Sequence, residues 1–126
     1  MATTLHVLSI GSQDSCNAVR DALLQRHNCR LSAVTSLRDM YAIPERINCD
    51  IAILHHTLSR LETRNASEYI RRRWPGAKIL VISAEIDVLD DPLYDEWAPP
   101  DQSPETLLAT IEQLTGGAKK EYMKSA

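Results

Sequence analysis

The stretch Cys49-Asp50-Ile51-Ala52-Ile53-Leu54 ends in an uninterrupted apolar run. Such a run is typical of a strand that is buried on both faces, as in a parallel sheet. The stretch Lys78-Ile79-Leu80-Val81-Ile82-Ser83 has the same pattern. The two stretches therefore predict neighbouring central strands of a parallel α/β sheet.

A helix is predicted between these two strands. Ser59-Arg60-Leu61-Glu62 matches a capping box, in which a serine and a glutamate bond to each other's backbone at a helix start. We expect this helix to run to about Arg73, where Trp74-Pro75-Gly76 ends it. Its inward-facing residues are predicted to be Leu61, Ala66, Tyr69 and Ile70.

The rest of the chain continues the alternation of strands and helices. The other predicted strands are Leu5–Ile10, Arg30–Thr35 and Trp97-Ala98, and the other predicted helices are Ser12–His27, a helix from Leu37 that buries Leu37, Met40, Tyr41 and Ile43, and a helix from Ser103 that buries Leu107, Leu108, Ile111 and Leu114. Strict alternation predicts a doubly wound parallel sheet of five strands. The segment Ala84 to Glu96 contains Pro92 and leaves room for a short helix at most.

Composition excludes several classes of protein. The 126 residues carry a net charge of −3, which does not suit a protein that coats nucleic acid or anionic lipid. The three cysteines have no C-x-x-C spacing, and this argues against a disulfide framework or a zinc site. We find no membrane-length apolar run and no secretory signal. We therefore expect a cytoplasmic domain over residues 1–117 without metal or cofactor, and a flexible tail over residues 118–126.

Five arginines cluster in the helix after Ser59, at positions 60, 64, 71, 72 and 73. We interpret them as a solvated helix face, because we see no aromatic residues interleaved with them as in proteins that bind single-stranded nucleic acid. The expected partners therefore include no nucleic acid.

The sequence resembles the receiver domain of bacterial two-component response regulators. The resemblance runs from about Leu5 to Leu114. It rests on the order of segments and on three matches: Cys49–Leu54 with the third strand, Arg71–Ala84 with the third-helix exit and fourth strand, and Ser103–Leu108 with the start of the last helix. It implies a flavodoxin-like fold.

The resemblance also implies a site for phosphorylation of an aspartate. That chemistry needs a carboxylate nucleophile, Mg²⁺ held by acidic residues, a lysine, and a serine or threonine. The acceptor position falls on His55, the acidic pair falls on Gly11 and Ser12, and the lysine position falls near Pro100. Only Ser83 matches the pattern. The resemblance therefore implies a degenerate pseudo-receiver that is not an enzyme and acts through protein–protein interaction.

Two other functions stay open. His55 and His56 are adjacent on a strand end, so their rings should point to opposite faces and should not share a metal ion. A small-molecule or pH sensor, or an enzyme, would instead use the crevice at the carboxyl ends of the strands, lined by His55, Ser83, Ser12 and His6. A histidine phosphorylated in place of an aspartate is the third possibility.

The expected partner surface lies around the segment Ala84 to Glu96 and the short strand that follows it. Its candidate anchors are Leu89, Leu93, Tyr94 and Trp97. The resemblance implies a sensor kinase or an output protein as partner, and a homodimer stays open.

Overall fold

A computed structural model describes residues 4–23, 29–84 and 93–117 of the chain. Three predictions lie outside the described residues: the flexible tail over 118–126, the short helix before the fifth strand, and the partner contact at Leu89. The last part of the helix predicted to reach His27 also lies outside them.

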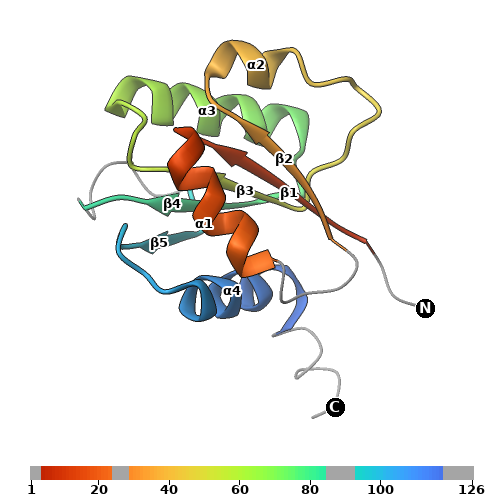
Figure 1. Ribbon diagram of the computed structural model, residues 1–126. Helices are drawn as coiled ribbons and strands as arrows, with labels where there is room; N and C mark the ends of the chain where they lie inside the picture. The colour runs from red at the N-terminus through yellow and green to blue at the C-terminus, as the bar shows by residue number, and fades with distance from the viewer. Residues whose placement is uncertain (1–3, 24–28, 85–92, 118–126) are drawn as a thin grey trace.

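A five-stranded sheet forms the centre of the molecule (Figure 1). Its strands are β1 (Leu5–Ile10), β2 (Cys29–Val34), β3 (Ile51–Leu54), β4 (Lys78–Ile82) and β5 (Glu96–Ala98). They lie in the order β2-β1-β3-β4-β5, and all four neighbouring pairs are parallel. The predicted doubly wound parallel sheet is thereby confirmed.

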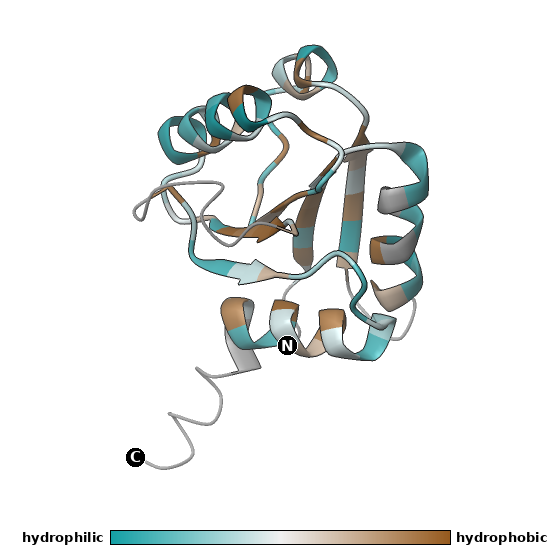
Figure 2. Ribbon diagram, turned by 90° about the vertical axis from the view of Figure 1, so that its left-hand side faces the viewer, coloured by the Kyte–Doolittle hydropathy of each residue, from teal (hydrophilic) through white to brown (hydrophobic). Residues whose placement is uncertain are grey.

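Helices cover both faces of this sheet. They are α1 (Gln13–Leu23), α2 (Leu37–Tyr41), α3 (Arg60–Arg73) and α4 (Pro104–Glu112), which continues into the π-helical turn η1 (Gln113–Gly117). Helices α1 and α4 lie on one face, and α2 and α3 lie on the other (Figure 1). Figure 2 shows the hydrophobic residues gathered on the strands, whereas α3 is mostly hydrophilic.

The central strands contribute to both layers of the core. Ile51 and Ile53 of β3 pack toward α1 and α4, whereas Ala52 and Leu54 pack toward α2 and α3. Successive side chains of a strand point to opposite faces, so a strand between two helical layers must be apolar throughout. This explains the uninterrupted apolar run with which the sequence predicted the fold.

Serines begin three of the helices, and the sequence predicted two of these starts, at Ser59 and Ser103. Ser36, Ser59 and Ser103 each accept a hydrogen bond from the backbone of their helix's first turn. The capping box is complete: the Ser59 N–H donates to Glu62 Oε1 at 2.9 Å, and the Glu62 N–H donates to Ser59 Oγ at 3.1 Å.

Two predicted core residues are wrong. Leu61 is 67% exposed and Tyr41 is 49% exposed. The buried stripe of α3 consists of Thr63, Ala66, Ser67 and Ile70. The buried hydroxyls of Thr63 and Ser67 donate to the carbonyls of Ser59 and Leu93, so two polar side chains that the prediction left out belong to the buried stripe, whereas Tyr69 packs against the core partly buried.

Candidate functional site

The residues predicted for the site lie where the strands end. Gly11 and Ser12 follow β1, His55 follows β3, Ser83 follows β4, and Pro100 lies two residues after β5. The strands are parallel, so these ends share one edge of the sheet. The backbone ties them together, because the His55 N–H donates to the Ile10 carbonyl at 3.0 Å and the Ser83 N–H donates to the Ala98 carbonyl at 3.0 Å.

His55 is buried and has a polar partner that the sequence analysis missed. Its side chain is 4% exposed, and its Nε2 atom lies 2.7 Å from the Oγ atom of Ser9, which is fully buried in β1. The tautomer of the ring decides which of the two atoms donates. The signal in the sequence was a single serine within the mostly apolar strand Leu5–Ile10, two residues before the glycine that follows the strand.

Burial also fixes the charge of this ring. Burial, followed by the positive charge of His56, lowers the pKa of His55 from 6.5 to about 4. The imidazole is therefore neutral at pH 7. A neutral ring keeps one acceptor nitrogen and one donor N–H, which suits a hydrogen bond to a hydroxyl.

The side chain of His55 requires a glycine at position 11. A Cβ atom at Gly11 would lie 2.6 Å from His55 Cβ, 3.0 Å from His55 Cγ and 3.0 Å from Thr57 Oγ1. Thr57 Oγ1 also accepts a hydrogen bond from the Ser12 N–H at 2.9 Å. His55, Gly11 and Thr57 thus form one packed unit, with no room for a longer side chain at position 11.

Little space remains beside His55. A pocket of about 50 Å³ lies between the ends of β3 and β4 and the loop before α4; it is lined by His55, His56, Ile82, Pro99, Pro100, Gln102 and Leu107. Pockets for organic ligands are usually about 300–1,000 Å³, so this one suits only water-sized molecules. The Oε1 atom of Gln102 is buried and has no hydrogen-bond partner among the described residues.

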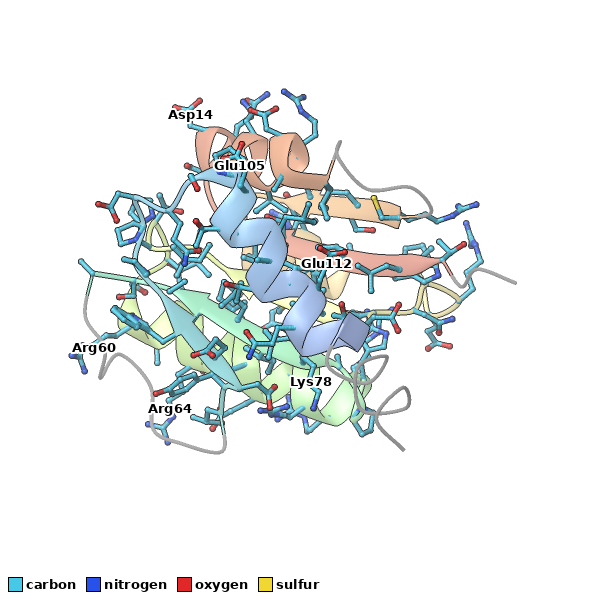
Figure 3. All side chains as sticks on the ribbon, turned by 90° about the horizontal axis from the view of Figure 1, so that it is seen from below. Asp14, Arg60, Arg64, Lys78, Glu105 and Glu112 are labelled. Carbon is cyan, nitrogen blue, oxygen red and sulfur yellow. The ribbon has the colours of Figure 1, made fainter. Side chains whose placement is uncertain are left out.

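The residues at this edge do not fit Mg²⁺. A magnesium ion prefers oxygen ligands, above all carboxylates. Gly11 offers no side chain, and His55 offers a nitrogen that already bonds to Ser9. The nearest acidic residue of α1, Asp14, is exposed and points away from the sheet (Figure 3). In the described part of the chain, no three His, Cys, Asp or Glu side chains are grouped as metal ligands.

One residue is not where the sequence analysis expected it. His6, proposed to line the crevice with His55, lies at the amino end of β1, where its N–H donates to the Asp50 carboxylate at 2.8 Å. That prediction is wrong, because β1 pairs with β3 in parallel and the two histidines lie at opposite ends of the pair. His56 is exposed.

The candidate partner residues are half-buried. Leu93 and Tyr94 pack against the core between the sheet and α3, and the indole N–H of Trp97 donates to the Ser83 carbonyl at 2.9 Å. Asp95 anchors the same segment, since its carboxylate accepts the Ile79 N–H at 2.8 Å and lies 3.2 Å from the Arg71 guanidinium. A partner at this surface would therefore contact the edges of residues that also support the fold.

Comparisons with known proteins point to one fold. No protein-family model and no curated protein match the sequence. Among solved structures, the chain is similar to a CheY-like receiver domain protein from Methanospirillum hungatei JF-1, with 15% identity and a TM-score of 0.75 over 94% of this chain and 98% of that one. It is also similar to a response regulator from Thermotoga maritima, with 17% identity and a TM-score of 0.72 over 89% of this chain and 98% of that one.

The chemotaxis response regulator CheY4 of Vibrio cholerae is similar to the same degree, with 17% identity and a TM-score of 0.73 over 88% of this chain and 98% of that one. No helix among the described residues has the length and apolar character that crossing a membrane requires. The chain therefore has the flavodoxin-like fold of response-regulator receiver domains, with its sheet in the order β2-β1-β3-β4-β5.

Proposed function

We propose that the chain is a receiver-like signalling module that acts by binding protein partners and is not switched by phosphorylation of an aspartate. One observation carries this proposal: a neutral, buried imidazole fills the edge of the sheet where the chemistry would occur. His55 is 4% exposed, bonds to Ser9, and leaves no space for a side chain at Gly11.

The chemistry supports the same conclusion. Transfer of a phosphoryl group to a carboxylate needs a nucleophilic carboxylate oxygen, a metal ion, and a positively charged side chain that neutralises the developing negative charge. Asp50 cannot serve as the nucleophile, because it lies at the amino end of β3 and accepts a hydrogen bond from the His6 N–H. The position of the family's lysine falls near Pro100, and the chain has no lysine between Lys78 and Lys119.

The alternative use of this edge as a sensor has less support. A pocket of about 50 Å³ is too small for an organic ligand. A pKa of about 4 places the charge change of His55 far below neutral pH, so the ring would not respond between pH 6 and 8. Phosphorylation of His55 at Nε2 would require that atom to leave Ser9, and the whole side chain is only 4% exposed.

Intact-mass spectrometry tests the first part of the proposal. The folded protein is incubated with Mg²⁺ and acetyl phosphate, beside a receiver domain that has the complete acidic set. We expect an adduct of one phosphoryl group on the reference domain and none on this chain. A stoichiometric adduct that forms on the native chain, and does not form when the chain is unfolded before incubation, contradicts the proposal.

Site-specific photo-crosslinking tests the second part. A benzophenone amino acid is placed at Tyr94, in the candidate partner surface, and in a matched control at Leu61, which is 67% exposed on α3. We expect one discrete adduct at position 94 in cells, with a protein or a second copy of this chain, and none at position 61. No adduct at position 94, or equal adducts at both positions, contradicts the proposed surface.

A further inference from the structure

A larger pocket lies at the opposite edge of the sheet from His55. Its volume is about 580 Å³, and it opens between the segment before β3 and the last turn of α3. Three aromatic residues line it, Tyr41, Tyr69 and Trp74, together with Arg72, Arg73, Glu45 and Asn48. This volume lies within the range of pockets that enclose small organic ligands.

Direct hydrogen bonds hold the walls of this pocket in place. The Arg73 guanidinium donates to the carbonyls of Ile43 at 2.8 Å and Pro44 at 2.6 Å, and to the Tyr69 hydroxyl at 2.9 Å. The Trp74 indole N–H donates to the Ile47 carbonyl at 3.1 Å. These bonds join the segment before β3 to the end of α3, so a ligand would meet walls that are already ordered.

The aromatic rings gather here more than elsewhere. The chain has four tyrosines, two tryptophans and no phenylalanine, and two of the tyrosines and one tryptophan line this pocket. Tyr41 and Tyr69 meet edge to face, with centroids 4.8 Å apart, and Tyr41 is 49% exposed. The prediction that no aromatic residues interleave with the arginines of α3 is therefore wrong at the end of this helix.

The two arginines at the pocket form no ion pair within the described part of the chain. Arg73 donates to neutral oxygens and lies 4.3 Å from the centroid of the Trp74 ring, and Arg72 is exposed; neither forms an ion pair with a described residue. By contrast, Arg64 pairs with Glu68 at 3.5 Å and Arg71 pairs with Asp95 at 3.2 Å. Among the described lining residues, Glu45 is the one that is acidic against the two arginines, so these residues together carry a net positive charge.

We propose that this pocket binds one nucleotide as a nucleoside phosphate. The base stacks on the exposed ring of Tyr41, and the phosphate pairs with Arg72. Glu45 and Asn48 face the same space with acceptor and donor groups that suit the polar edge of a base. Aromatic faces beside an unpaired arginine are the combination that holds a planar ring joined to an anion. This proposal does not depend on the absence of phosphorylation at the other edge.

Calorimetric titration with the four nucleoside 5′-monophosphates tests the site. We expect saturable binding of at least one of them. Binding should weaken about tenfold in Arg72→Ala, which loses a charge-assisted hydrogen bond, and at least fivefold in Tyr41→Ala, which loses the stacking surface. Arg64→Ala, on the same helix but outside the pocket, should bind as the unchanged protein does.

Two further probes separate the parts of the ligand. The nucleoside without phosphate should bind the unchanged protein more weakly than the monophosphate does. In Arg72→Ala, the nucleoside and the monophosphate should bind with equal affinity. Inorganic phosphate alone should bind much more weakly than the monophosphate. Both substituted side chains are exposed, so thermal unfolding should show that both variants fold.

Three results would overturn the proposal: no saturable binding of any monophosphate, equal affinity in Arg72→Ala, or binding of a single-stranded oligonucleotide without binding of the monophosphates.

Discussion

The two edges of the sheet differ in how much space they leave. At the carboxyl edge, the buried His55 ring packs against Gly11, and a pocket of about 50 Å³ remains. At the amino edge, aromatic and arginine side chains surround a pocket of about 580 Å³. In parallel α/β folds, ligands usually bind outside the carboxyl ends of the strands. Here the packing around His55 closes that edge between β3 and β4, and a larger pocket lies at the other edge.

The largest expected effect is the loss of stability at acidic pH, and it tests whether the carboxyl edge is closed. The pKa of His55 is about 4 in the folded protein and 6.5 when the ring is free. The unfolded chain therefore binds a proton below pH 6.5 that the folded chain refuses, and stability falls as the pH drops from 6.5 to 4. We expect this residue to cost roughly 3 kcal/mol at pH 4.

Urea unfolding at a series of pH values measures this effect. In His55→Asn, which has no titrating ring, the curve should lose this part of its pH dependence. An unchanged slope between pH 6.5 and 4 in that variant would mean that His55 titrates as a solvent-exposed ring does.

The substitution Gly11→Ala tests the packing of the same edge. The new methyl group would lie 2.6 Å from His55 Cβ, so we expect a loss of about 2 kcal/mol in the free energy of unfolding. The nearest atom is Cβ, which alanine at position 55 would keep. The matched background is therefore His55→Gly, in which Gly11→Ala should cost less. Equal costs in both backgrounds would mean that the cost of Gly11→Ala does not come from contact with the His55 side chain.

The substitution Ser9→Ala tests the hydrogen bond beneath the ring. Removing the hydroxyl leaves Nε2 of His55 buried without Ser9, which should cost about 1–2 kcal/mol. Ser32→Ala, at a half-buried serine of β2, provides the comparison and should cost less. If the two alanine variants unfold at the same urea concentration, Ser9 is a packing residue only.

The smallest effect is expected at the amino edge. Arg72→Ala removes an exposed side chain that forms no ion pair with a described residue, so stability should change by less than about 0.5 kcal/mol. Thermal unfolding of the nucleotide-free protein measures it. A larger loss of stability would mean that the Arg72 side chain stabilises the fold, in contrast to the binding role proposed for it.

The sequence predicted the fold better than it predicted either edge. Apolar runs such as Ile51–Leu54 identify buried strands because both faces of the strand meet helices, and the serines at 59 and 103 identify helix starts because they bond to the first turn. Leu61 misled the prediction because the core accepts Thr63 and Ser67 once their hydroxyls find carbonyl partners.

Contacts between distant residues lay beyond the sequence pattern. The resemblance to receiver domains pointed to Gly11 and His55, which the structure places against each other at the carboxyl edge. The bond from His55 to Ser9 joins residues far apart in the chain, and the direction of a ring at a strand end is not encoded in spacing. The amino-edge pocket likewise brings Tyr41 to Tyr69 through packing between α2 and α3.

The central claim is that the carboxyl edge is occupied by a neutral imidazole and has no place for a metal ion. NMR of the ¹⁵N-labelled protein tests it directly, through the ring nitrogens of His55 and the backbone amides of Gly11 and Ser12. We predict a ring that stays neutral from pH 7 to pH 5 and amide signals that do not move when Mg²⁺ is added. A ring that becomes protonated near pH 6.5, or a saturable Mg²⁺ shift at Gly11 and Ser12, would contradict the claim.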